Sequence, residues 1–420
     1  MITKPSTKSK VKEGDIMRLL DLYEKDPSKK VTIYFEGKSL EAYKGEPIHV
    51  ALLANGIKWI TTSGHGRKRG AFTFGPVLVT INGIRNYDGR KTKVWNGMKI
   101  EMQSYMEPLP ERLGEIGKVR RYYTDIVIVG SGAAGLGAAL EMQDDLEVMV
   151  FEEKGRLGWG LLKRSVLLSN GKKPKEFREE LVEQLRAKTF TRTPVLGVFR
   201  DGEYFIVVAN RGNDLIEVTA KRVVISTGGI AKFTLFENNE MPGVFREDFV
   251  LELLNIWGVK PGNKVTIYGS NSQNIARELE NHGLNYTLIE NPILRAEGEN
   301  EVERVVDAEG IVYETDALII AEGYRPDIHL AQQVGGEIAY IEELGGYLPL
   351  RNKRNEIVDG IYIAGNASWI KGSYENYLEG RLVGAYIIEE FGLRGNVDQI
   401  KREFLKKIGD KASLLEEVIL

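Results

Sequence analysis

The sequence predicts an α/β protein in which two dinucleotide-binding folds follow a small β-rich module at the N-terminus. Three observations predict this arrangement. An apolar strand at 125–129 runs directly into a Gly-x-Gly-x-x-Gly motif and a helix. A second strand begins at 264, and the distance from it to the next strand is similar to that in the first unit. Before both, short strands and one helix alternate between 31 and 102, which indicates a β-grasp module.

The glycine motif joins a predicted strand to a predicted helix. Residues 126–129 are all β-branched, which is typical of a buried parallel strand. Gly130 permits the tight turn, Gly132 lets the backbone approach a pyrophosphate, and Gly135 lets the helix pack on the strand. We therefore expect the amides of this segment, including those of Ser131 and Ala134, to hold phosphates at the helix N-terminus.

The next predicted strand, 147–151, ends in Glu152. This acid follows Gly132 by about 20 residues, the distance at which a ribose-binding carboxylate is expected. The alternative is a glycine-rich turn in an ordinary βαβ unit. Because strand, glycines, helix and acid are all in register, we favour adenine dinucleotide binding.

Composition excludes several other classes of function. The chain has 420 residues, 57 basic and 60 acidic side chains and a net charge of −3, which gives no general attraction to nucleic acid. It has no cysteine, so cysteine-bound metal clusters and dithiol chemistry are excluded. Residues 1–12 lack the apolar core of a secretory signal, and no stretch is apolar over the length of a membrane span. We expect a cytoplasmic protein without a membrane span.

A basic loop at 64–70 is the conspicuous surface feature of the N-terminal module. It contains three consecutive basic residues between glycines. It could hold a phosphate or contact a partner's flavin. The alternative, a solvated loop without a ligand, is the interpretation we favour.

The second dinucleotide-type fold begins with a strand at 264–268, and Glu290 ends its next strand. Its loop keeps only the first glycine, Gly269. Asn271 and Asn274 add side chains where a pyrophosphate and close helix packing require none. The sequence therefore predicts a degenerate fold that is kept for packing.

Residues 72–83 (Phe-Thr-Phe-Gly-Pro-Val-Leu-Val-Thr-Ile-Asn-Gly), with Gly97 and Met98 after them, resemble a known module. It is the ferredoxin-like module of hydrogen cyanide synthase and opine oxidase small subunits, which also opens the α subunits of heterotetrameric sarcosine oxidases. Some relatives bind a [2Fe–2S] cluster through cysteines of this region. Here Thr73 stands at one such position, so the resemblance implies a β-grasp module without its iron–sulfur cluster.

Four further segments resemble two-dinucleotide flavoproteins. The acids at 152–153 precede two glycines, 223–229 resembles the strand and turn that return to the dinucleotide, and 361–367 resembles the final strand and Gly-Asp of flavin-binding members. Asn366 replaces that aspartate. With the helix that opens at 372, the predicted cofactor-binding residues are Gly130, Ser131, Gly132, Ala134, Gly135, Glu152, Glu153, Gly158, Gly160, Thr227, Gly228, Gly365, Asn366 and Glu375.

Together these segments resemble the α subunits of sarcosine oxidases and archaeal dye-linked L-proline dehydrogenases over about residues 31–393. The resemblance implies a two-dinucleotide-binding-domain flavoprotein fold and an FAD-dependent oxidoreductase subunit acting on CH–NH donors. It implies FAD in the first site, with NAD or ATP as alternatives, and an FMN shared with a partner as an option. An amine-oxidase-type β subunit would oxidise a small amine or imino acid.

Two other functions remain open from the sequence. One is a self-contained NAD(P)H-dependent flavoprotein reductase, and the other is a non-catalytic scaffold that holds a nucleotide. No histidine or carboxylate set has a spacing that fixes a catalytic site, so we name no catalytic residue and no metal ligand. The expected division is an arm (1–30), the β-grasp module (31–106), the first nucleotide-binding domain (107–235 and 326–393), the degenerate fold (236–325) and a C-terminal helix (394–420).

Overall fold

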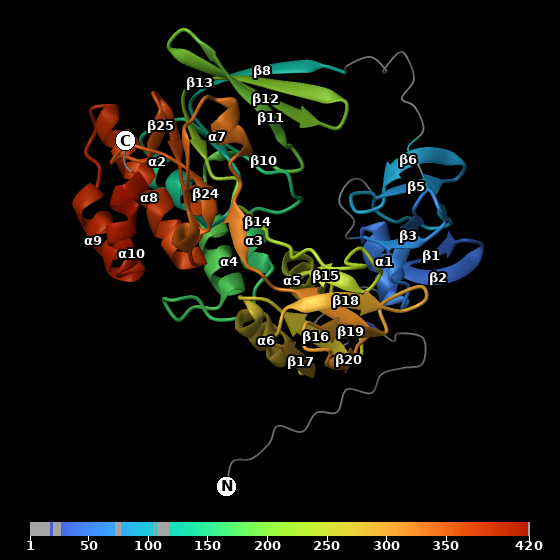
Figure 1. The fold of residues 1–420 in the computed structure, drawn as a ribbon. Coiled ribbons are helices and arrows are strands. Elements are labelled where there is room, and N and C mark those ends of the chain that lie inside the picture. The colour runs from blue at the N-terminus through green and yellow to red at the C-terminus, as the bar shows by residue number, and fades with distance from the viewer. Residues whose placement is uncertain (1–16, 20–26, 72–76, 105, 107–116, 419–420) are drawn as a thin grey trace. The chain divides into compact units, whose positions relative to one another are not determined.

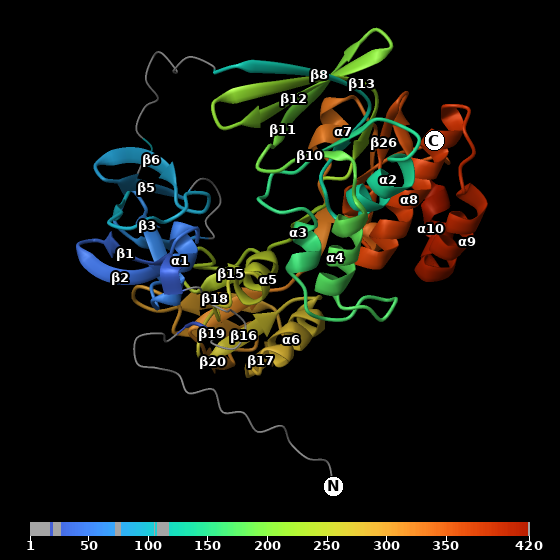
Figure 2. The ribbon, with the colours of Figure 1, turned by 180° about the vertical axis from the view of Figure 1, so that it is seen from behind.

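The structure is a computed structural model that describes residues 17–19, 27–71, 77–104, 106 and 117–418. The chain divides into two compact units (Figures 1 and 2). Unit 1 contains Met1–Arg112 and Ala231–Gly323, and unit 2 contains Leu113–Ile230 and Tyr324–Leu420. Unit 1 thus joins the β-grasp module to the second dinucleotide-type fold, and unit 2 holds the glycine motif.

The module in unit 1 has a five-stranded sheet of order β2-β1-β7-β5-β6. A helix lies beside it with its apolar side chains buried against the sheet. The short strands β3 and β4 form a separate pair. The elements are β1 (Lys30–Phe35), β2 (Lys38–Tyr43), α1 (Ile48–Ala54), β3 (Trp59–Thr62), β4 (Lys68–Gly70), β5 (Leu78–Ile81), β6 (Ile84–Asp88) and β7 (Lys99–Met102).

The remainder of unit 1 is built on a parallel four-stranded sheet of order β15-β21-β16-β17. Two helices pack on it, and an antiparallel three-stranded sheet, β18-β19-β20, completes this part. The elements are β15 (Val244–Arg246), α5 (Glu247–Asn255), β16 (Val265–Tyr268), α6 (Ser272–Asn281), β17 (Tyr286–Ile289), β18 (Ile293–Glu297), β19 (Arg304–Asp307), β20 (Val312–Glu314) and β21 (Ala317–Ile320).

Two buried side chains of the β-grasp module, His49 and Lys58, contact the rest of unit 1. The imidazole of His49 on α1 lies 5.2 Å, centroid to centroid, from the ring of Phe249 on α5. Its Nδ1 lies 3.3 Å from the Gly89 carbonyl oxygen. The buried ammonium of Lys58 donates to the Asp316 carbonyl oxygen at 2.5 Å. The β-grasp module is therefore an integral part of unit 1.

Unit 2 is organised by an eight-stranded sheet in which β10-β9-β8-β13 are parallel neighbours. The long strand β13 pairs with β26 through its last three residues and with the antiparallel ribbon β12-β11 through its earlier part. The strands are β8 (Val119–Val129), β9 (Val148–Phe151), β10 (Lys188–Phe190), β11 (Val195–Asp201), β12 (Tyr204–Arg211), β13 (Asp214–Ile225), β25 (Glu356–Val358) and β26 (Ile361–Ile363).

Helices of unit 2 lie against this sheet and against one another, and Figure 1 shows α9 and α10 next to α8. The helices are α2 (Ala133–Met142), α3 (Trp159–Leu162), α4 (Pro174–Gln184), α7 (His329–Gln333), α8 (Ser373–Glu390), α9 (Val397–Ile408) and α10 (Lys411–Leu414). The short strands are β14 (Gly229–Ala231), β22 (Tyr324–Pro326), β23 (Ile338–Ile341) and β24 (Gly346–Pro349). None of the helices described is long and apolar enough to cross a bilayer.

Strand β11 is an edge of the unit 2 sheet, and a side chain covers part of it. Gln333, the last residue of α7, accepts a hydrogen bond from the Val198 N–H at 3.0 Å and donates one to the Val198 carbonyl oxygen at 2.8 Å. The amide side chain thus pairs with the backbone as a neighbouring strand would.

The strands extend beyond the segments that the sequence predicts. The segments 216–219 and 221–225 form one continuous strand, β13, because its pairing with β8 extends from 215 to 225. The same pairing makes 119–121 part of β8, although their polar composition suggests a linker. The last part of the basic loop is strand β4. The motif residues 72–76 and most of the N-terminal arm lie outside the described residues.

We predict that His49 makes unit 1 acid-sensitive. Burial lowers the pKa of its imidazole to about 4 from its usual 6.5, while Glu252 opposes the shift. Since the unfolded chain binds this proton more readily, the contribution of neutral His49 is present above pH 6.5 and is lost as the pH falls toward 4. The full loss is about 3 kcal/mol.

Thermal unfolding of wild-type protein and His49→Gln between pH 7.5 and 4.5 measures this effect. The melting temperature of the wild type should fall more steeply with acid than that of the variant. His65→Gln, at an exposed histidine, is the matched control. Parallel slopes for wild type and His49→Gln would contradict the prediction.

Candidate functional site

Two glycines of the motif, Gly130 and Gly135, occupy positions that no other residue fits. Gly130 follows β8 with a φ of +100°, and a Cβ built on it would lie 2.4 Å from the Ser226 carbonyl oxygen. A Cβ built on Gly135 would lie 2.0 Å from the Gly130 carbonyl oxygen. Both distances are too short for real atoms, so these two glycines allow β8, α2 and the strand β13 to meet.

At the start of α2, in contrast to Gly130 and Gly135, the space next to the backbone is free of protein atoms. Gly132 is the N-cap residue with a φ of −63°, and nothing lies within 4 Å of a Cβ built there. Leu136 donates the first helical hydrogen bond, to the Gly132 carbonyl oxygen at 2.9 Å. The amides that precede it have no intrahelical acceptor, and no acidic side chain occupies the first turn. Such a helix start binds phosphate.

Glu152 lies next to this helix start and is 7% exposed. Its carboxylate accepts hydrogen bonds from the Ser131 N–H at 3.1 Å, the Ser131 hydroxyl at 2.5 Å and the Lys154 N–H at 2.7 Å. A carboxylate has about four acceptor positions, so one ribose hydroxyl can still be accepted. The structure therefore brings Glu152 and Ser131 together.

The loop after Glu152 contributes one glycine to this group. Gly158 has a φ of +68°, and its N–H donates to the Ser131 carbonyl oxygen at 2.9 Å. The other two predicted residues of this loop, Glu153 and Gly160, are exposed. Glu153 forms an ion pair with Lys154 at 3.1 Å and is not directed to the other predicted residues by any contact.

The turn after β13 passes the glycine motif. The Thr227 Cα lies 3.3 Å from the position of a Cβ on Gly130. Gly228 has a φ of +91° with open space beside it, and its carbonyl oxygen accepts the Asp327 N–H at 3.1 Å. Thr227 and Gly228 thus lie next to the glycine turn that follows β8.

The turn after β26 approaches α2 from the other side. Gly365 has a φ of +78°, and a Cβ there would lie 2.8 Å from the Ala134 Cβ. Asn366 follows and is partly exposed. Glu375 is 9% exposed, and its carboxylate lies over Gly372, where a Cβ would come within 2.2 Å of it. Contacts thus bring Glu152, Gly158, Thr227 and Gly365 to the glycine motif and the start of α2, and Gly228 and Asn366 adjoin them in sequence. Among the described contacts, none brings Glu153, Gly160 or Glu375 there.

A buried ion pair beneath this turn escaped the sequence analysis. The side chains of Lys371 and Glu379 are 2% and 1% exposed, and their charged atoms are 2.8 Å apart. Glu379 accepts the Gly365 N–H at 2.6 Å and the Ser368 hydroxyl at 2.9 Å. Lys371 donates to the Gly365 carbonyl oxygen at 2.9 Å. Burial lowers the pKa of Lys371 to about 8, and Glu379 opposes the shift.

The sequence contains one weak indication of this buried ion pair. Glu379 is a carboxylate in the apolar helix α8, and burial of an acid requires a partner. Lys371 precedes that helix in a turn where a solvated lysine is the usual expectation. Only the fold shows that both point under Gly365.

In the second dinucleotide-type fold, which belongs to unit 1, side chains of the protein occupy the start of helix α6. Asn271, the N-cap residue of α6, donates a side-chain hydrogen bond to the buried carboxylate of Glu247. Asn274 donates to the Asn271 side-chain oxygen at 2.5 Å. Glu322 accepts the Ser270 N–H at 3.2 Å. Two carboxylates thus lie where the phosphates of a dinucleotide would need positive charge.

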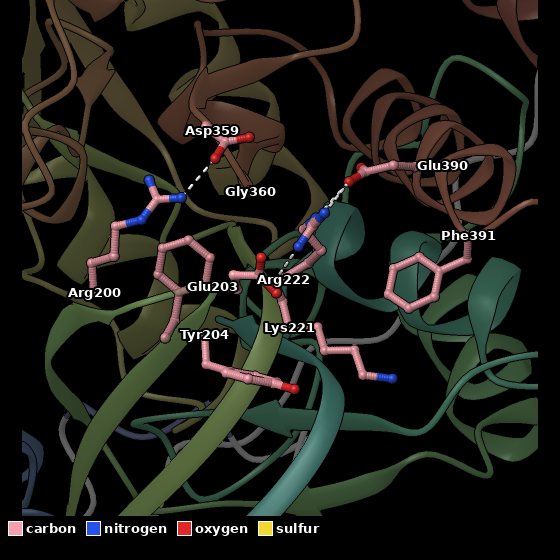
Figure 3. Close-up of a pocket in the computed structure, with 10 residues that line it drawn as sticks. Arg200, Glu203, Tyr204, Lys221, Arg222, Asp359, Gly360, Glu390 and Phe391 are labelled. Atoms are coloured by element: carbon pink, nitrogen blue, oxygen red, sulfur yellow. Dashed lines mark hydrogen bonds and ion pairs between the residues drawn. The ribbon is translucent and has the colours of Figure 1, made fainter.

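A pocket of about 490 Å³ lies elsewhere in unit 2 (Figure 3). Its lining has three basic and three acidic side chains, and none of the predicted cofactor-binding residues. Arg200 is paired with Asp359, and Arg222 is paired with Glu390. Since its charges are balanced and two ion pairs lie within its lining, we assign no ligand to it. The described residues also contain no group of three or more possible metal ligands.

Two segments of the chain match known domain families. Residues 28–105 match the 2Fe-2S iron-sulfur cluster binding domain, and residues 124–270 match the pyridine nucleotide-disulphide oxidoreductase family. The T. acidophilum thioredoxin reductase structure covers 64% of this chain and 99% of its own at 19% identity and a TM-score of 0.52. That likeness shows the fold alone.

Longer similarities extend through both units. The structure of L-proline dehydrogenase from P. horikoshii is 47% identical, covers 93% of this chain and 79% of its own chain, and has a TM-score of 0.87. Sarcosine oxidase subunit α from Corynebacterium sp. (strain U-96) is 24% identical over 79% of this chain and 41% of its own length. The sarcosine oxidase subunit α from Rhizobium meliloti is 23% identical, and the match covers 86% of this chain and 46% of the length of that relative. The chain spans less than half the length of these two curated relatives.

Gly135 and Gly132 should respond differently to the same substitution. Gly135→Ala places a Cβ against the Gly130 backbone and should lower the melting temperature by several degrees. Gly132→Ala has open space and an ordinary φ, so its melting temperature should stay near that of the wild type. Differential scanning calorimetry compares them, and equal destabilisation would show that the turn is not packed as described.

The buried ion pair should contribute to stability far more than an exposed one. Glu379→Gln leaves the Lys371 ammonium buried without a counter-charge, and should lower the free energy of unfolding by about 3 kcal/mol. Glu180→Gln makes the same substitution in the exposed pair with Lys172 and should change it by less than about 1 kcal/mol. Urea unfolding measures both, and similar small losses would argue against the buried pair.

Proposed function

The chain belongs to the family of the P. horikoshii L-proline dehydrogenase and the sarcosine oxidase α subunits, and from this premise we propose that it is the nucleotide-binding subunit of a multi-subunit amine or imino-acid oxidase or dehydrogenase. The observation that carries the proposal is the open helix start at Gly132 with the buried Glu152 beside it. A diphosphate and a ribose hydroxyl are the groups that these two features complement.

FAD is the cofactor we propose for this site, with NAD or ATP as alternatives. The amides at the start of α2 would hold the phosphates, and Glu152 would accept a hydroxyl of the adenosine ribose. Gly228 leaves open space beside this turn, where a longer cofactor would continue. A bound flavin supplies two-electron redox chemistry, whereas the chain's own residues bind and orient it. An FMN shared with a partner subunit is compatible with this arrangement.

The substrate chemistry belongs to a partner in this proposal. The curated relatives are longer than this chain, and their names describe sarcosine oxidase subunits. We propose an amine-oxidase-type β subunit as the partner, with a small amine or imino acid as its substrate. No catalytic acid or base is assigned to this chain, because the residues around α2 bind and position rather than face a reacting bond.

We further propose that the β-grasp module holds no iron–sulfur cluster. The module matches a cluster-binding family, yet the sequence has no cysteine to ligate iron. Thr73, which stands at one ligand position of the relatives, lies outside the described residues. The module instead packs on the rest of unit 1 through His49 and Lys58. A cytoplasmic location is also part of the proposal, and cell fractionation tests it.

The filled helix start of the second fold argues against a self-contained NAD(P)H-dependent reductase. Such an enzyme needs a second nucleotide site, and Glu247 and Asn271 occupy that position. Rapid bleaching of a bound flavin by NADH would restore the alternative. A colourless protein that retains nucleotide and shows no activity with any partner would support the scaffold interpretation.

The test begins with the visible spectrum of the purified chain and mass analysis of the nucleotide released from it. We expect a nucleotide, and expect Gly132→Val to lower its affinity by about tenfold or more, because a side chain displaces the phosphates from the amides. Amine oxidation with an artificial acceptor should require the partner subunit. Strong turnover by this chain alone would refute the division between subunits.

A further inference from the structure

The side chain of Ser131, inside the glycine motif, has a hydroxyl whose hydrogen-bond direction is fixed. Ser131 is 0% exposed. Its Oγ lies 2.5 Å from the Glu152 Oε2 and 3.3 Å from the Gly158 N. Because the Gly158 N–H can only donate, the Ser131 Oγ is the acceptor in that contact. The hydroxyl proton is therefore directed to Glu152, and the three groups form a chain of hydrogen bonds with one direction.

Helix α4 holds the loop that contains Gly158. The Arg178 Nε donates a hydrogen bond to the Leu157 carbonyl oxygen at 2.9 Å. Gly158 has a φ of +68°, and a Cβ built on it would lie 2.7 Å from the Arg178 Cγ, so glycine fits this position best. The Gly158 N–H also donates to the Ser131 carbonyl oxygen at 2.9 Å. The loop is thus bonded to both oxygens of Ser131.

Ser131 provides two of the three hydrogen bonds described for the Glu152 carboxylate. Oε2 accepts the Ser131 N–H at 3.1 Å and the Ser131 hydroxyl at 2.5 Å, whereas Oε1 accepts the Lys154 N–H at 2.7 Å. Among these described donors, the Ser131 hydroxyl is the one that belongs to a side chain. The last torsion of a glutamate is otherwise soft, so these bonds determine which way the carboxylate faces.

We propose that Ser131 is a positioning residue whose buried hydroxyl holds the Glu152 carboxylate in the orientation that accepts a ribose hydroxyl of the nucleotide. The inference rests on the proposed function and gives a side chain of the motif a role in it. The phosphates require only backbone amides between the first two glycines, so the motif itself leaves the side chain at this position open. An acceptor that is already oriented binds more tightly, because no torsion has to be fixed on binding.

Titration calorimetry on the full chain, freed of nucleotide, tests this role with ADP and 2′,3′-dideoxy-ADP as probes. Ser131→Ala should weaken the binding of ADP by about fivefold, because the carboxylate is no longer held. The affinity for 2′,3′-dideoxy-ADP, which has no ribose hydroxyl to donate, should stay within about twofold of the wild-type value. A merely structural role would weaken both probes alike. Ser169→Ala, at an exposed serine, is the matched control and should change neither affinity.

Two further variants keep the test decisive if Ser131→Ala does not fold. Ser131→Cys retains a weaker donor and should cause a smaller loss for ADP. In Glu152→Ala protein, Ser131→Cys should cause no further loss, because its effect passes through the carboxylate.

Unchanged binding of ADP, equal weakening of both probes, or an undiminished loss in the Glu152→Ala background would overturn the inference and leave the proposed function intact. Failure of the wild-type protein to bind ADP, ATP, NAD and FAD would instead overturn the proposed function.

Discussion

Close approach of backbone to backbone fixes the position of helix α2. A Cβ on Gly135 would lie 2.0 Å from the Gly130 carbonyl oxygen, and one on Gly380 of α8 would lie 1.9 Å from the Ala134 carbonyl oxygen. A Cβ on Gly137 would lie 2.4 Å from the Tyr377 carbonyl oxygen. Because backbone meets backbone at these three glycines, the first amides of α2 have a defined direction, and the proposed nucleotide site depends on that direction.

The two dinucleotide-type folds have the same order of strand, turn and helix, but they differ in the charge at the start of that helix. In unit 2 the start of α2 is open and bears no acid in its first turn. In unit 1 the start of α6 is capped by Asn271, which is bonded to the buried Glu247. A carboxylate at a helix start provides the negative charge that a phosphate would otherwise bring. The start of α6 therefore has its negative charge from the protein itself and needs no phosphate to supply it.

Local patterns predicted the parts of the fold that have local causes. The run 126–129 and the glycines after it determine a strand, a turn and a helix within a few residues of one another, and β8 and α2 follow that prediction. The start of β8 at Val119 was missed because it depends on pairing with Leu215, almost a hundred residues away. Gly130, Gly132, Gly135 and Glu152 could be predicted for the same local reason. Lys371 and Glu379 could not, because their ion pair depends on how a turn and a helix pack under Gly365.

The side chain of Gln333 has a consequence for how the protein associates with others. An exposed sheet edge is a template on which a strand of another chain can form, and this leads to open-ended aggregation or to binding of extended peptides. At Val198 the donor and the acceptor of β11 are already engaged by one amide group. Extension of the sheet through that residue would require this amide to leave, so assembly with another subunit is directed away from strand addition at this edge.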